Sequence, residues 1–320
     1  MKKLTQLTLG LCLSATIVSA ETIEWTTGQI GGGWYTMAAG IAKIIEKETT
    51  VQLKIVPGGG TSNPSKVQKN KAQLGLGLDS ITYLATQGKD IYKGRKHNNV
   101  ALIAGGLSDT IFQVVRSKDA KFTNIGDLFK KGGKGTNIAV TKAGSSDEKI
   151  FSWLMAYYGT SYADMKKRGY KIIHGNYSEI SAQYKDGLID YAFVNLGTPG
   201  SSVIDMLLSR EGIITNLPND LMDSLKNNWG YNKGNLPANT YKGQDYVVNT
   251  GKMSTIFFAN TNLSTNTVYN ITKVFCENQS LLGNIHGSMK NFTCENALKN
   301  ATIKVHPGAI KYYKEMGYIK

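Results

Sequence analysis

Four times along this chain, a short β-rich run leads into a loop of glycine and hydroxyl residues, and the loop then opens a helical segment. The four loops are residues 28–35, 58–63, 144–147 and 197–200. Strands that alternate with helices in this way are typical of α/β chains with parallel strands. The sequence therefore predicts an α/β fold with a largely parallel sheet, in which ligands bind beyond the carboxyl ends of the strands.

The periodicity and the turn residues also place the individual segments. Strands are expected over residues 22–26, 51–56, 73–78, 137–141 and 189–194. Helices are expected over residues 34–47, 63–70, 81–87, 147–158, 201–209 and 309–316.

Two further apolar runs begin alike, with TIFQVVRS at 110–117 and TIFFANTN at 255–262. We expect them to be two strands that cross between two lobes. Lobe I would consist of residues 21–110 together with 253–320, and lobe II of residues 111–252. Such a shape places a ligand in the cleft between the lobes.

The first twenty residues have the pattern of a secretory signal peptide. Lys2 and Lys3 form a basic start, residues 4–18 are mostly apolar, and Val18-Ser19-Ala20 offers small residues for cleavage. The sequence therefore predicts cleavage after residue 20 and an exported mature chain.

The chain is basic, with a formal net charge of +14. The lysines are scattered and form no arginine-rich or aromatic-interleaved tract, so nucleic acid is not the expected partner. The charge indicates an anionic small ligand, an anionic membrane surface, or simply a solvated surface.

Outside the signal peptide there are two cysteines, Cys276 and Cys294. In an exported protein such a pair predicts one disulfide. Metal binding is the weaker interpretation, because neither cysteine belongs to a C-x-x-C pair and the histidines show no ligand spacing. No metal and no cofactor is predicted.

The four loops carry the candidate binding residues. Backbone N–H groups and the helix dipole at a helix start favour a carboxylate or a phosphate. The glycines allow close approach of the backbone, and the hydroxyls add donors. With the neighbouring aromatic and acidic residues, the predicted ligand-binding set is Gly32, Gly33, Trp34, Tyr35, Gly60, Thr61, Asn63, Asp79, Ser80, Gly144, Ser145, Ser146, Gly197 and Thr198.

Alternatives stay open for these residues. Each loop taken alone also fits an ordinary turn with a helix cap. One of Trp34 and Tyr35 is expected to pack against the sheet, and the other to contact the ligand. Asp79 either accepts a ligand ammonium group or caps the helix that follows it.

Catalytic patterns are weak. Residues 146–149 match S-x-x-K, but the companion S-D-N and K-T-G signatures are missing, so the match is interpreted as chance. There is no G-x-S-x-G elbow.

The motifs together resemble the TAXI solute receptors, the extracytoplasmic binding proteins of one class of TRAP transporters. The similarity covers nearly the whole chain after the signal peptide. The family's Gly-Ser-Gly-Thr-like loop corresponds to residues 144–147, where Asp147 stands in place of a hydroxyl. The other matching segments are Thr27 to Tyr35, Gly59 to Asn63, Ala72 to Asp79, Gly197 to Pro199, Pro237 to Tyr241 and His306 to Gly317.

This resemblance implies a type II periplasmic binding protein fold and a monomeric periplasmic receptor without catalytic activity. It also implies a TRAP permease as partner and a small carboxylate as ligand, and the expected ligand is L-glutamate or a related amino acid or dicarboxylate. The four arginines, Arg95, Arg116, Arg168 and Arg210, lie in no motif loop. Two rival hypotheses are a periplasmic sensor and a dehydratase-like enzyme on the same scaffold.

Overall fold

The computed structural model describes residues 22–320, and the predicted signal peptide lies outside them. The strands form a mixed sheet in the order β2-β1-β3-β11-β5-β8-β6-β7, with β4 and β10 paired to β11 and β9 paired to β5. The strands are β1 (Thr22–Thr26), β2 (Gln52–Val56), β3 (Leu74–Leu78), β4 (Val100–Ala104), β5 (Asp109–Ser117), β6 (Asn137–Thr141), β7 (Lys171–Gly175), β8 (Tyr191–Leu196), β9 (Gly212–Ile214), β10 (Asn232–Leu236) and β11 (Val248–Asn260).

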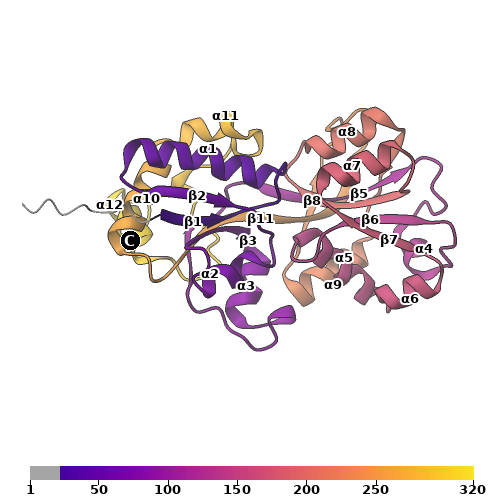
Figure 1. Ribbon diagram of the computed structural model, residues 1–320, viewed down its shortest axis with the longest axis horizontal. Helices are drawn as coiled ribbons and strands as arrows, with labels where there is room; N and C mark the ends of the chain where they lie inside the picture. Colours follow the sequence, from indigo (N-terminus) through magenta and orange to yellow (C-terminus); the bar gives the residue numbers. More distant parts are fainter. Residues whose placement is uncertain (1–21) are drawn as a thin grey trace, which may run out of the picture.

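Helices cover both faces of this sheet, with α1, α7, α8 and α11 on one side and α2, α3, α5 and α9 on the other (Figure 1). The α-helices are α1 (Gly33–Glu48), α2 (Asn63–Gln68), α3 (Asp79–Gln87), α4 (Ile125–Lys130), α5 (Ser146–Tyr157), α6 (Tyr162–Lys167), α7 (Tyr177–Lys185), α8 (Ser201–Ser209), α9 (Asn219–Trp229), α10 (Thr265–Glu277), α11 (Leu282–Ile285) and α12 (Pro307–Glu315). The short 3₁₀ helices are η1 (Asp90–Tyr92), η2 (Gln279–Leu281), η3 (Gly287–Met289) and η4 (Cys294–Asn296).

The molecule has two lobes, and β5 and β11 join them (Figure 1). Strand β11 pairs with β3 and β4 in lobe I, and its residues 252–254 pair antiparallel with residues 109–111 of β5. The α/β fold class and the two crossing strands are thus confirmed. The positions at which the chain passes from one lobe to the other, 110/111 and 252/253, stay a prediction.

The sheet is less parallel than the sequence indicates. Strands β1, β2 and β3 of lobe I, and β6, β7 and β8 of lobe II, run parallel to one another. The crossing strands run antiparallel to their neighbours β3 and β8. The reason is topological, because β5 and β11 connect the lobes directly and have no crossover helix. Strand β11 also begins at Val248, seven residues before the expected start at 255, and extends into lobe II.

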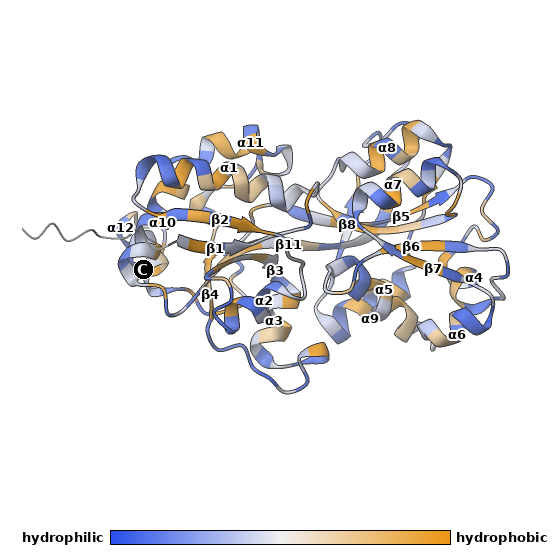
Figure 2. Ribbon diagram, viewed as in Figure 1, coloured by the Kyte–Doolittle hydropathy of each residue, from blue (hydrophilic) through white to orange (hydrophobic). Residues whose placement is uncertain are grey.

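Each lobe has an apolar core against its part of the sheet. In lobe I the Trp25 and Phe257 rings stack at 4.5 Å between centroids, and in lobe II Phe151 meets Phe193 at 4.8 Å. Figure 2 shows apolar segments on strands such as β6 and mixed polar and apolar turns on α1. Burial of such aromatic side chains is a main source of stability.

Strand β3 shows why its sequence alternates leucine with glycine. A Cβ atom on Gly75 would lie 2.4 Å from the Phe258 ring, and a Cβ atom on Gly77 would lie 2.6 Å from it. The missing side chains therefore make room for the aromatic ring of the adjacent strand β11, and the leucines are fully buried. A larger residue at either glycine would overpack the core.

Cys276 at the end of α10 and Cys294 in η4 form a disulfide with a Cα–Cα distance of 5.6 Å, which confirms the predicted pairing. Replacing both cysteines by alanine should lower the free energy of unfolding by about 3 kcal/mol, because the bond restricts the unfolded chain over a loop of 18 positions. Urea unfolding measures this loss. Dithiothreitol should destabilise the natural protein and leave the variant unchanged; equal stability of the variant and the oxidised protein would contradict the prediction.

Candidate functional site

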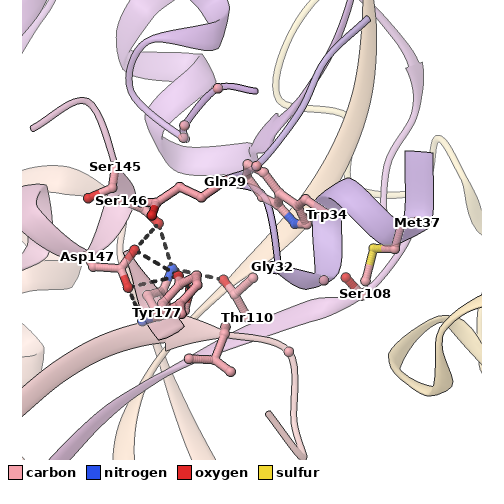
Figure 3. Close-up of a pocket in the computed structure, with 18 residues that line it drawn as sticks. Gln29, Gly32, Trp34, Met37, Ser108, Thr110, Ser145, Ser146, Asp147 and Tyr177 are labelled. Atoms are coloured by element: carbon pink, nitrogen blue, oxygen red, sulfur yellow. Dashed lines mark hydrogen bonds between the residues drawn. The ribbon is translucent and has the colours of Figure 1, made fainter. Parts of the chain in front are cut away.

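A cavity lies between the lobes, where the loops after β1, β2, β6 and β8 meet (Figure 3). Lobe I contributes the start of α1 and the loop 58–60, and lobe II contributes the start of α5 and residues 195–197. Predicted binding residues that line this cavity are Gly32, Gly33, Trp34, Gly60, Ser145, Ser146 and Gly197. The sequence-derived loops therefore do converge, as the topology of an α/β sheet requires.

Other predicted residues lie outside the cavity lining and have contacts of their own. Asn63 Oδ1 accepts from Gly59 N and Thr26 Oγ1, both at 2.9 Å, and its Nδ2 donates to the backbone carbonyls of Thr27 and Leu76. This buried side chain fixes the glycine loop that borders the cavity. Its role in the structure is to position that loop.

Asp79 lies outside the cavity lining and is the first residue of α3, whose N-cap is Leu78. Its Oδ1 accepts from Ser80 N at 2.7 Å and from Ser254 N at 3.2 Å. Ser80 Oγ donates to the carbonyl of Gly230 in lobe II at 2.7 Å. Tyr35 and Thr198 also stand apart from the lining residues. Of the two aromatic residues after the first loop, Trp34 is the one that lines the cavity, and its Nε1 donates to Thr255 Oγ1 at 3.1 Å.

The lobes touch at the mouth of the cavity through backbone groups. The N–H groups of Thr61 and Ser62, at the start of α2, donate to the Gly144 carbonyl at 3.2 and 3.3 Å. A Cβ atom on Gly59 would lie only 2.4 Å from the same carbonyl oxygen. Thr61 and Gly144 thus contribute to a contact between the lobes, and only glycine at position 59 permits this approach.

The lining residues outside the predicted set include Gln29, Met37, Ser108, Thr110, Asp147, Tyr177 and Asn195. Ser108 directly precedes the crossing strand β5, Thr110 belongs to that strand, and Asn195 lies near the end of β8. Asp147 directly follows the predicted residues Ser145 and Ser146. An acidic residue within a glycine–serine loop was the sequence feature that could have identified it. Tyr177 comes from α7, and no motif in the sequence marks it.

Asp147 is the charged group of this cavity. Its carboxylate accepts from Asn195 N at 2.7 Å, from the Tyr177 hydroxyl at 2.9 Å and from Ser146 Oγ at 3.2 Å. Burial raises the pKa of Asp147 to about 6, although these hydrogen bonds favour the ionised form. Burial beside this carboxylate also raises the pKa of Tyr177, so its hydroxyl remains a donor.

Replacing Asp147 by asparagine should change how stability depends on pH. The unfolded chain loses this proton near pH 3.9, and the folded chain keeps it up to about pH 6. The stabilisation from this group is therefore full below pH 4 and is lost as the pH rises through 6. Between pH 4 and 7, the natural protein should lose on the order of 2–3 kcal/mol relative to the variant. Urea unfolding at both pH values measures this, and parallel pH dependences would contradict it.

The cavity contains hydrogen-bond donors for an anion and no arginine. Ser145 Oγ accepts from Thr141 Oγ1 at 2.6 Å and from Glu148 N at 3.1 Å, so its own proton is available to a ligand. Arg116 donates to the Ser117 carbonyl, and Arg168 donates to the Phe129 carbonyl and Thr160 Oγ1, all away from the cavity. Lys66 and Lys142 line an adjoining outer hollow that shares Gln29, Gly58 and Ser145 with the cavity.

The S-x-x-K match has no catalytic geometry. Lys149 Nζ lies 2.9 Å from Asp90 Oδ1, and the Ser146 hydroxyl donates to Asp147. The lysine is therefore engaged in an ion pair and does not activate the serine. Among residues 22–320, no cluster of three or more His, Cys, Asp or Glu side chains has the arrangement of a metal site.

Two α/β lobes joined by crossing strands, with a cavity between them, are the architecture of periplasmic binding proteins. The chain belongs to the NMT1-like family, whose model matches residues 25–317. Within residues 22–320, none of the helices has the length and apolar character needed to cross a membrane.

Solved structures agree with this fold. MatC from Rhodopseudomonas palustris with bound malate is 14% identical, with a TM-score of 0.55 over 92% of this chain and 96% of that chain. The periplasmic binding protein BugD is 12% identical, with a TM-score of 0.54 over 93% of this chain and 98% of that chain. These likenesses agree with the periplasmic binding protein fold that the sequence predicts.

Proposed function

We propose that this protein is the extracytoplasmic receptor of a TRAP transporter of the TAXI class, and that it captures a small carboxylate in the cavity between its lobes. L-glutamate, or a related amino acid or dicarboxylate, is the proposed ligand. The receptor closes around the ligand and delivers it to the permease in the membrane. The signal peptide over residues 1–20 and the periplasmic location are parts of the same proposal.

The observation that carries this proposal is the convergence of two helix starts on one cavity. Gly33 begins α1 in lobe I, and Ser146 begins α5 in lobe II. Each start has free N–H groups and the positive end of a helix dipole, which together favour an anion. The free proton of Ser145 adds a hydroxyl donor at the same place.

The TAXI assignment is supported by the order and spacing of the motifs from residue 27 to residue 317. The end of the chain agrees with this pattern, since His306 Nδ1 caps α12 through Gly308 N, and Tyr312 and Tyr313 are buried. The basic outer hollow with Lys66 and Lys142 suits an acidic ligand that approaches from solvent.

Calorimetry with L-glutamate, glutarate, malate and 2-oxoglutarate tests ligand capture. The Ser145→Ala variant should bind the best of these about 10- to 100-fold more weakly, because one hydrogen bond to a charged group is lost. Ser161→Ala is the matched control, since Ser161 caps α6 in the same way, outside the cavity. Absence of binding by every carboxylate would refute the proposal. The transport role is tested with vesicles that contain the permease. They should take up the ligand only when the receptor is added.

A further inference from the structure

The polar side of the cavity presents more hydrogen-bond acceptors than the protein satisfies. Asn195 lines the cavity, is 3% exposed, and its Oδ1 has no hydrogen-bond partner. Gln29 also lines it, and its buried Oε1 is unpartnered as well. The Asp147 carboxylate lies beside them. Buried polar atoms without a hydrogen-bond partner are rare in folded proteins, so the two amide oxygens require an explanation.

The hydrogen bonds around Asn195 determine which end of its amide is free. The Ser146 hydroxyl donates to Asp147 Oδ2, and the Thr110 hydroxyl donates to the Met253 carbonyl. Both hydroxyl protons are thus engaged, so these oxygens can only accept from Asn195 Nδ2, which lies 3.2 Å from each. The unpartnered atom is therefore the carbonyl oxygen, an acceptor.

The acceptors belong to one side of the cavity. In Figure 3, Gln29, Ser146, Asp147 and Tyr177 lie on one side, and the Trp34 ring and Met37 lie on the other. Among residues 22–320, none that lines the cavity is a lysine, an arginine or a histidine. The buried negative charge of Asp147 thus has hydrogen-bond donors around it but no positive side chain in the cavity wall, and such a charge favours a cation from outside.

We propose that Asp147, Asn195 and Gln29 form a subsite for the ammonium group of the ligand, so that the substrates of this receptor are α-amino acids rather than dicarboxylates or 2-oxo acids. This inference rests on the proposed function and specifies its ligand class. An ammonium group has three donors and one positive charge. The three oxygens accept those donors, and the carboxylate neutralises the charge.

The donors for the other half of an α-amino acid lie close to this subsite. Ser145, with its free proton, stands two residues before Asp147 at the start of α5. In an α-amino acid the ammonium and the carboxylate are attached to the same carbon atom. One helix start therefore offers an acceptor and a donor to two adjacent groups of one ligand. At pH 7 the carboxyl is ionised, because its pKa of about 6 lies below that pH.

Matched pairs of ligands that differ only at the α position provide the test, with affinities from calorimetry at pH 7.5. The probes are L-glutamate and 2-oxoglutarate, L-leucine and 4-methyl-2-oxopentanoate, and L-alanine and pyruvate. In the pair that binds, the amino acid should bind about 10- to 100-fold more tightly than its 2-oxo acid, since the latter leaves the acceptors unpaired. The Asp147→Asn variant should reduce this preference to less than about threefold.

Asp147→Thr is the second uncharged variant, because its hydroxyl can still accept from Asn195 N if the asparagine variant fails to fold. Asp205→Asn, a change of an exposed acid on α8, is the control and should keep the full preference. Equal binding of an amino acid and its 2-oxo acid, or a preference that survives in a folded Asp147 variant, would overturn the inference while a carboxylate receptor would still stand. If no member of any pair binds, the inference fails, and the proposed function fails with it only when glutarate and malate do not bind either.

Discussion

Replacing Gly59 by alanine should prevent the lobes from closing and weaken ligand binding by about a hundredfold or more. The new Cβ atom would lie 2.4 Å from the Gly144 carbonyl oxygen, and backbone atoms on both sides leave no flexible group to move aside. The lobes must then separate, and the bonds from the N–H groups of Thr61 and Ser62 to this oxygen are lost. Overpacking costs about 1–3 kcal/mol, and each of the two lost hydrogen bonds costs about 1 kcal/mol. Their sum corresponds to this loss of affinity.

Calorimetry and small-angle scattering together measure this effect. The natural protein should bind the carboxylate and become more compact on saturation, whereas the Gly59→Ala variant should keep its ligand-free radius. Gly132→Ala is the control, because a Cβ atom there meets nothing within 4 Å. An unchanged affinity in a folded Gly59→Ala variant would show that this contact between the lobes does not accompany binding.

The sequence was sufficient to predict the fold because the signals were local and repeated. The glycine–hydroxyl loops, the strands before them and the helices after them agree with the structure to within a few residues, as for Asn63 at the start of α2 and Ser201 at the start of α8. The antiparallel pairing of β11 was missed. It depends on a contact between residues 109–111 and 252–254, and no local pattern encodes a pairing across 140 positions.

The candidate site was predictable only in part, for a related reason. Loop residues such as Gly32 and Ser145 belong to recognisable motifs, and they do line the cavity. Tyr177 lies in a segment where no helix was expected, and Asn195 directly follows the strand expected over residues 189–194. Only the packing of α5 and α7 against β8 brings the Tyr177 hydroxyl and the Asn195 backbone N–H to Asp147. The sequence left Asp79 open as an ammonium acceptor or a helix cap; Asp79 lies outside the cavity lining, and the acid that lines the cavity is Asp147.

A further contact between the lobes is ionic. Asp90 in η1 of lobe I accepts from Lys149 Nζ and from Trp153 Nε1 of α5 in lobe II, both at 2.9 Å. The two ionic side chains are only 11% and 19% exposed. Replacing Asp90 by asparagine keeps a residue that tolerates the positive φ of 53° at this position, and it removes only the charge.

The Asp90→Asn variant should bind its ligand about 30- to 150-fold more weakly. Removing one partner of a buried ion pair costs about 3–5 kcal/mol, and the partial exposure of this pair reduces the expected cost to about 2–3 kcal/mol, which gives that ratio. The cost falls on the closed state, because separated lobes leave both Asp90 and Lys149 in water. Calorimetry with the best carboxylate measures it.

The control for this prediction is Asp223→Asn, which breaks the exposed pair of Asp223 with Lys233, whose atoms lie 2.6 Å apart within lobe II. Exposed pairs of this kind contribute about 0–1 kcal/mol, and this one does not join the lobes, so its removal should leave affinity nearly unchanged. Added salt should weaken the Asp223–Lys233 pair more than the Asp90–Lys149 pair, since screening acts more strongly on exposed charges. If Asp90→Asn lowers the melting temperature of the ligand-free protein but leaves affinity intact, the ion pair stabilises the fold and has no part in closure.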